Sequence, residues 1–103
     1  MKENRHLEFK SEITNTFLKT VSAFANFGYG EIWFGIDDNG NVNGINNPEE
    51  VCLDIENRIN DSISPRPDFE LSVDYKHHIV KLMVREGAYT PYLYKGKAYR
   101  RSD

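Results

Sequence analysis

Three acidic residues in the first half of this sequence are the side chains best suited to chemistry. Glu3 and Glu8 lie close together near the N-terminus, and Asp38 follows a strongly apolar stretch, with Asp37 as the alternative aspartate. Carboxylate oxygens are the ligands that Mg²⁺ and Mn²⁺ prefer, and water can fill the remaining positions. If these carboxylates converge, they would form a site for a divalent metal.

The same residues also allow a purely structural interpretation. Residues five apart on a regular strand point to opposite faces, so Glu3 could join Glu8 only from a turn before the strand. Otherwise Glu3 is a solvated terminal residue, and Asp37 and Asp38 belong to the polar turn that the following Asn-Gly pair predicts. The spacing leaves both interpretations open.

A basic, aromatic segment near the C-terminus is the second candidate site. Cations alternating with tyrosines suit phosphate contacts and base stacking, whereas the structural alternative is an edge hairpin whose lysines block strand pairing. Lys10, beside Glu8, either contacts a phosphate or neutralises the carboxylates. The segment contains Lys95, Lys97, Arg100 and Arg101, interleaved with Tyr92, Tyr94 and Tyr99.

Length and composition indicate one small domain. The chain has 103 residues, of which 39% are hydrophobic and 13% aromatic, enough for one packed core but not two. Its single cysteine, Cys52, cannot form an internal disulfide. No signal peptide or membrane-spanning stretch is recognisable, so we expect a cytoplasmic protein. The chain ends in what resembles an unfinished segment, which predicts a fragment of a longer protein.

The charge distribution moderates an objection to nucleic-acid binding. A net charge of −3 counts against a general binder of phosphates. However, residues 1–50 contain four basic and eight acidic side chains, whereas residues 51–103 contain nine basic and eight acidic ones. The basic excess therefore lies toward the C-terminus.

Hydrophobic periodicity predicts an α+β fold with a mixed or antiparallel sheet and two helices packed on it. Apolar residues at helical spacing from Ile13 to Phe24 predict a first helix, which Gly28 ends. Asn47 and Pro48 predict the start of a second helix, whose apolar stripe runs to Ile63. The predicted order is β-α-β-β-α-β-β-β-β, with strands at 7–10, 31–36, 42–45, 69–73 and 79–84 and a last hairpin at 92–94 and 97–99.

Five fragments in order resemble the Schlafen AlbA-like DNA-binding domain family. They cover nearly the whole chain at spacings similar to those of the family, and Tyr29 between Gly28 and Gly30 departs from the usual Gly-Gly turn. The fragments are Glu3 to Glu8-Phe9-Lys10, Ala23-Phe24-Ala25-Asn26, Gly28-Tyr29-Gly30, Phe34-Gly35-Ile36-Asp37-Asp38, and Gly40-Asn41-Val42-Asn43-Gly44. In addition, the segment from Pro91-Tyr92 to Tyr99-Arg100-Arg101-Ser102 resembles the closing hairpin and arginine of the family.

The resemblance implies two possible activities. Prokaryotic members are similar to N-terminal modules of predicted transcriptional regulators, whereas some animal Schlafen proteins cut structured RNA with two glutamates, an aspartate and a divalent metal. The matching positions in this sequence are Glu3, Glu8 and Asp38.

Our leading hypothesis is a DNA-binding module of a transcriptional regulator. It would contact phosphates through Lys10, Lys95, Lys97, Arg100 and Arg101, act as a homodimer because bivalence raises effective affinity, and need no cofactor. The first alternative is an endoribonuclease using Mg²⁺ or Mn²⁺. The second is a dimerisation or ligand-sensing module without a nucleic-acid partner.

Overall fold

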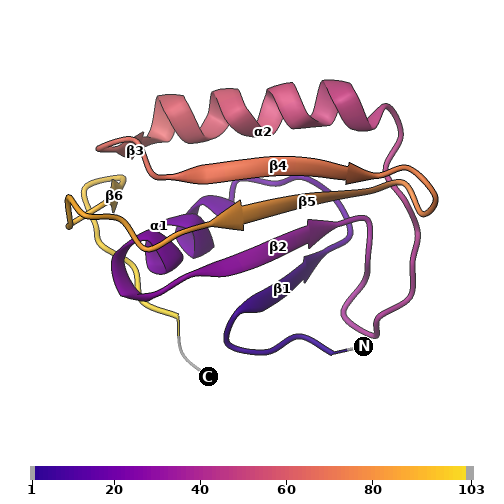
Figure 1. Cartoon of the computed structure of the whole chain (residues 1–103), viewed down its shortest axis with the longest axis horizontal. Helices are drawn as coiled ribbons and strands as arrows, with labels where there is room; N and C mark the ends of the chain where they lie inside the picture. Colours follow the sequence, from indigo (N-terminus) through magenta and orange to yellow (C-terminus); the bar gives the residue numbers. More distant parts are fainter. Residues whose placement is uncertain (1, 102–103) are drawn as a thin grey trace.

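The computed structural model describes residues 2–101, which form the expected α+β domain with two helices and a mixed sheet (Figure 1). A four-stranded sheet has the order β1-β2-β5-β4, in which β1 pairs parallel to β2 and the other pairs are antiparallel. The short strands β3 and β6 pair separately. The elements are β1 (Leu7–Lys10), α1 (Phe17–Phe27), β2 (Gly30–Phe34), α2 (Pro48–Ser62), β3 (Ile63–Ser64), β4 (Phe69–Asp74), β5 (Ile79–Val84) and β6 (Leu93–Tyr94).

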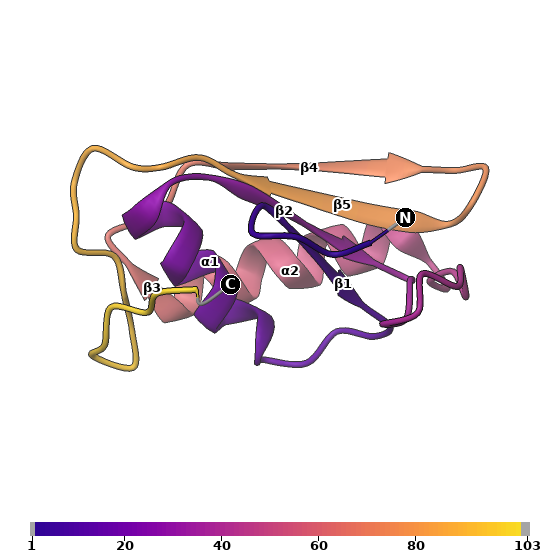
Figure 2. The ribbon, with the colours of Figure 1, turned by 90° about the horizontal axis from the view of Figure 1, so that it is seen from below.

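Both helices lie on one side of the four-stranded sheet (Figure 2). Alternate residues of a strand share a face, so Ile32 and Phe34 of β2 point toward the helices and are fully buried. The ring of Phe17 from α1 meets Phe34 edge to face, with centroids 5.4 Å apart. This layer is the main hydrophobic core, to which α2 contributes Ile55 and Ile59.

The opposite face of the sheet carries a smaller cluster around β1 and β2. Phe9, Ile36 and Ile79 are buried there, and Trp33 packs against them. Lys81 lies 4.2 Å above the Trp33 ring. The apolar and aromatic residues of β2 therefore pack on both faces of the sheet, as its sequence pattern predicts. Within residues 2–101, no helix combines the length and apolarity needed to cross a membrane.

The helices agree with the predicted periodicity except at their ends. Ile13 packs against the core from the segment before α1, and Ile63 opens β3 instead of extending α2. Asn47 precedes α2 but makes no side-chain cap, because its backbone is left-handed with φ 52°. The predicted boundaries differ where tertiary packing, rather than local propensity, ends the helix.

The strand order differs from the expected one in two places. The return strand predicted at 42–45 is a single bridge between Ile36 and Val42. The last hairpin is likewise reduced to one bridge between Tyr94 and Lys97, while β6 pairs with β3. In the first segment the backbone N–H groups of Asn43 and Gly44 both donate to the Gly35 carbonyl, and that of Ile45 donates to the His78 carbonyl. In the second segment the backbone N–H groups of Tyr92 and Tyr99 donate to side chains of α1.

Candidate functional site

The acidic candidates take up three separate positions around β1 and β2. Glu3 accepts a hydrogen bond of 2.9 Å from the backbone N–H of Phe9, on the edge strand β1. Glu8 is level with the buried Ile32 and turns toward the helices, where it accepts a 2.9 Å bond from Thr20. Asp38 is exposed in the turn after β2.

This arrangement does not bring the three carboxylates into one metal-binding group. Among residues 2–101, no three histidine, cysteine, aspartate or glutamate side chains lie close enough together to hold a metal ion. In this conformation Glu3 and Glu8 are both engaged by other partners. Metal binding by Glu3, Glu8 and Asp38 remains a prediction.

Asp37 has a clear structural role that distinguishes it from its neighbour. Its carboxylate accepts backbone hydrogen bonds of 2.9 Å from Asn39 and Asn41. The backbone N–H of Asn41, and then its side chain and the other N–H groups of the turn, lower the pKa of Asp37 below its usual value. Asp37 therefore stabilises the turn, so of the two aspartates Asp38 is the better candidate for chemistry.

Glu8 contacts three parts of the chain through two ion pairs and one hydrogen bond. Its carboxylate lies 3.7 Å from the Lys10 ammonium and 3.7 Å from the Arg101 guanidinium, and Thr20 of α1 donates to it. Lys10 also donates to Thr16 at 3.3 Å. Two of the predicted phosphate contacts, Lys10 and Arg101, are thus oriented and partly neutralised by Glu8.

Two buried polar side chains of α1 hold the C-terminal segment in place. Asn26 donates to the Tyr92 carbonyl at 2.8 Å and accepts from the Tyr92 N–H at 2.6 Å. Ser22 donates to the same carbonyl at 2.9 Å and accepts from the Tyr99 N–H at 3.1 Å. Asn26 and Ser22 therefore supply the backbone hydrogen bonds that a neighbouring strand would otherwise make. They also fix the position of the segment that follows Tyr99.

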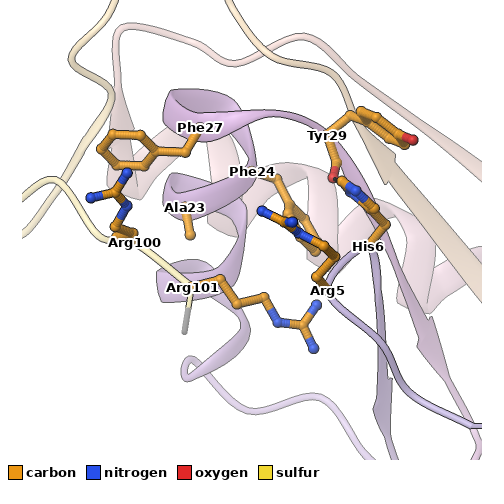
Figure 3. A pocket seen from close by; sticks show the side chains of 8 residues that line it. All are labelled: Arg5, His6, Ala23, Phe24, Phe27, Tyr29, Arg100 and Arg101. Atoms are coloured by element: carbon orange, nitrogen blue, oxygen red, sulfur yellow. Dashed lines mark hydrogen bonds between the residues drawn. The ribbon is translucent and has the colours of Figure 1, made fainter. Parts of the chain in front are cut away.

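Residues near the two ends of the chain, Arg5 and His6 from one and Arg100 and Arg101 from the other, come together beside α1 around a cavity of about 90 Å³, which we call the arginine cavity (Figure 3). Among residues 2–101, none of those that line it is acidic, and most are cationic or aromatic. They are Arg5, His6, Ala23, Phe24, Phe27, Tyr29, Arg100 and Arg101.

Cation–ring contacts organise the arginine cavity. The Arg101 guanidinium lies 5.4 Å from the Phe24 ring, and that of Arg100 lies 4.7 Å from Phe27. His6 stacks on Tyr29 with centroids 4.2 Å apart, and its Nδ1 donates to the Tyr29 carbonyl at 2.7 Å. The aromatic rings thus set the positions of the cations.

Arg101 retains unused hydrogen-bonding capacity in this arrangement. Its Nη2 donates to the Leu7 carbonyl at 3.3 Å, but Nη1 is buried and lacks a hydrogen-bond partner among the described residues. A buried donor on a charged group is costly to leave unpaired, so the position favours an anionic acceptor.

A second, more open hollow of about 410 Å³ continues the basic surface across α1. It shares Arg100 and Arg101 with the arginine cavity and adds Lys19, whose ammonium lies 5.7 Å from the Tyr99 ring. Glu8 also lines this hollow. Basic side chains from both ends of the chain and from α1 therefore form one continuous surface.

The predicted basic hairpin is divided by the structure. Arg100 and Arg101 line the arginine cavity, whereas Lys95 and Lys97 belong to the turn beyond β6. Tyr92 and Tyr94 are buried instead of presenting their rings to a ligand. Binding of nucleic acid by the two lysines remains a prediction.

Sequence reasoning missed five residues of this surface. The consecutive Arg5 and His6 between the two glutamates were a signal, because a strand at 7–10 places both at its N-terminal end. Phe27 and Tyr29 were a second signal, since aromatic residues around a helix stop have no core position to fill. Lys19 gave no separate signal. The missed residues are Arg5, His6, Lys19, Phe27 and Tyr29.

Comparison with known proteins supports the resemblance seen in the sequence. The model of the family described as "Schlafen, AlbA_2" matches residues 3–103. The search of curated proteins found no match. The structure is similar to the N-terminal domain of a predicted ATP-dependent DNA helicase RecG-related protein from Nitrosomonas europaea, solved by NMR in solution. That likeness has a TM-score of 0.62 and 25% identity, and covers 100% of this chain and 82% of the other.

Replacement of Asn26 by alanine tests the clamp on Tyr92. The variant leaves a buried N–H and a buried carbonyl short of partners, so we expect a loss of roughly 2–4 kcal/mol in the free energy of unfolding. Urea unfolding measures it, with Asn57→Ala on the exposed side of α2 as the matched control. Equal stability of the two variants would contradict the clamp.

The turn around Asp37 gives a pH-dependent prediction. Because folding lowers its pKa, ionised Asp37 stabilises the protein above its unfolded pKa, and that contribution is lost as the pH falls through the folded value. We therefore expect Asp37→Asn to be less stable than wild type at neutral pH and the difference to shrink in acid. A constant difference across the pH series of urea unfolding would refute this role.

Proposed function

Since the chain belongs to the Schlafen AlbA_2 family, we propose that it is a nucleic-acid-binding module that contacts phosphates through the arginine cavity and the adjoining surface of α1. The observation that carries the proposal is the convergence of Arg5, Arg100 and Arg101 around one cavity. Arginine donates in a planar fork that matches phosphate oxygens, and its charge releases counterions from the polyanion.

The chemistry of Arg101 supports an anionic ligand rather than a neutral one. Arg101 lines the cavity, and its Nη1 has no hydrogen-bond partner among the described residues, so a phosphate oxygen that reached this atom would complete its hydrogen bonding. Glu8 balances Arg101 before a ligand binds, and a phosphate would add the second negative charge that Lys10 and Arg101 together can accommodate. Backbone phosphates occur in every nucleic acid, so this contact sets affinity and not sequence preference.

The relative from Nitrosomonas europaea supports DNA as the target, because its name refers to a DNA helicase. On the same basis we propose that this chain is a module of a longer protein, since the similar structure is an N-terminal domain. A role in transcription regulation, assembly as a homodimer and a cytoplasmic location remain parts of the proposal.

The salt dependence of binding is the direct test. Wild-type protein should bind fluorescently labelled DNA with an affinity that falls steeply with salt, as measured by anisotropy. Arg100→Gln should weaken binding and lower the slope of log K against log salt by about one, because one phosphate contact is lost. Arg66→Gln removes the same charge from an exposed side chain outside the arginine cavity and should leave the slope unchanged.

Three results would overturn or redirect the proposal. Binding that is absent, or insensitive to salt, would refute it. Equal weakening by Arg66→Gln and Arg100→Gln would assign binding to overall charge instead of the cavity. Cleavage of structured RNA with Mn²⁺ but not with chelator would favour the nuclease alternative, and Glu8→Ala should then abolish the cleavage.

A further inference from the structure

On the premise that the chain binds nucleic acid, we propose that the arginine cavity and its aromatic rim select an unpaired nucleotide. The preferred ligand is accordingly single-stranded DNA or RNA. One phosphate would enter the cavity while an adjacent base stacks on Tyr29. The proposal rests on the exposed rings at the rim of the cavity and on the fixed position of Tyr29.

Two large aromatic side chains stand in solvent at the rim. Phe27 is 52% exposed and Tyr29 59% exposed, although α1 buries most of its other apolar side chains. In Figure 3 they lie on opposite sides of the arginine cavity, with Arg5 and Arg101 between them. Exposed rings that flank a cationic groove are the arrangement by which proteins bind unpaired bases, because every base offers a face for stacking.

The backbone and a neighbouring ring hold Tyr29 in position. Its ring lies nearly parallel to His6, at an interplanar angle of 7°, so one face is covered and the other remains available. Gly30 keeps the following backbone tight against the core, since a Cβ there would lie 2.2 Å from the Phe24 ring. A base stacking on Tyr29 would therefore lose little additional conformational entropy from the protein.

The arginine cavity is lined both by its arginines and by the two exposed rings, Phe27 and Tyr29. A phosphate held by the arginines would therefore bring the adjacent nucleotide next to these rings. The base of that nucleotide can stack on the free face of Tyr29.

Pairing is what distinguishes the possible ligands. In a duplex each base face is covered by its neighbours, so a duplex can supply the phosphate but not a free base face except at its ends. A single strand supplies both at once. Charge alone would favour the duplex, which has the higher density of phosphates, so preference for a single strand would report stacking.

Three ligands and three variants separate these contributions. Anisotropy titrations at one low salt concentration would compare a labelled single strand, the duplex of the same sequence, and a strand of the same length with abasic sites in place of bases. Tyr29→Ala removes the ring, Tyr29→Phe keeps it, and Tyr75→Ala removes an equally exposed tyrosine, 63% exposed, from the turn between β4 and β5.

We expect the single strand to bind about ten-fold or more tightly than the duplex and the abasic strand. Tyr29→Ala should remove most of that preference, whereas Tyr29→Phe and Tyr75→Ala should keep it. Equal binding of single strand and duplex, or of the base-containing and abasic strands, would overturn the inference while leaving the proposed function intact. An unchanged preference in Tyr29→Ala would also overturn it. Failure of all three ligands to bind would instead refute the proposed function.

Discussion

The structure depends on the clamp that Ser22 and Asn26 place on the backbone of Tyr92. The strands β3 and β6 contain only two residues each, and so short a ladder holds a chain terminus weakly. Side chains from α1 supply the hydrogen bonds that the backbone of this segment would otherwise lack. Each polar side-chain atom of Ser22 and Asn26 has a hydrogen-bond partner in the clamp. A fully satisfied buried network favours one arrangement over its alternatives, because any shift leaves a polar group unpaired. The segment leading to Arg100 is thereby directed across α1.

The other half of the site depends on the parallel pairing of β1 with β2. The backbone N–H of Glu31 donates to the His6 carbonyl at 2.8 Å, which places the turn before β1 against the end of α1. Segments at opposite ends of the sequence therefore contribute cations to one cavity. This local concentration explains how a chain of net charge −3 can present a basic surface. The field near a polyanion is set by the charges within about a Debye length, ~10 Å at moderate salt, more than by the total charge.

The sequence predicted what local periodicity controls and missed what non-local contacts control. The apolar stripe of α1, the alternation in β2 and the Pro48 start of α2 each have a local cause and were confirmed. The return strand at 42–45 was not formed, because its backbone donates to two different segments: the N–H groups of Asn43 and Gly44 to the Gly35 carbonyl, and that of Ile45 to the His78 carbonyl. Burial of Tyr92 and Tyr94 was also missed, since alternation predicts two faces without saying which tertiary partner covers them. Arg5 could be assigned to a site only once the parallel pairing of β1 was known.

Glu8 shows how one carboxylate can be interpreted in two chemical ways. In this conformation two cations at 3.7 Å balance it, and Thr20 completes its hydrogen bonding. A divalent metal at Glu8 would have to displace Lys10 or Arg101, because two like charges and a metal ion around a single carboxylate would repel one another. Phosphate binding requires no such displacement, since the ligand adds negative charge beside the same cations. The ion pairs of Glu8 therefore favour an anionic ligand at this surface over a bound cation, and they give the carboxylate a positioning role in the phosphate binding that we propose.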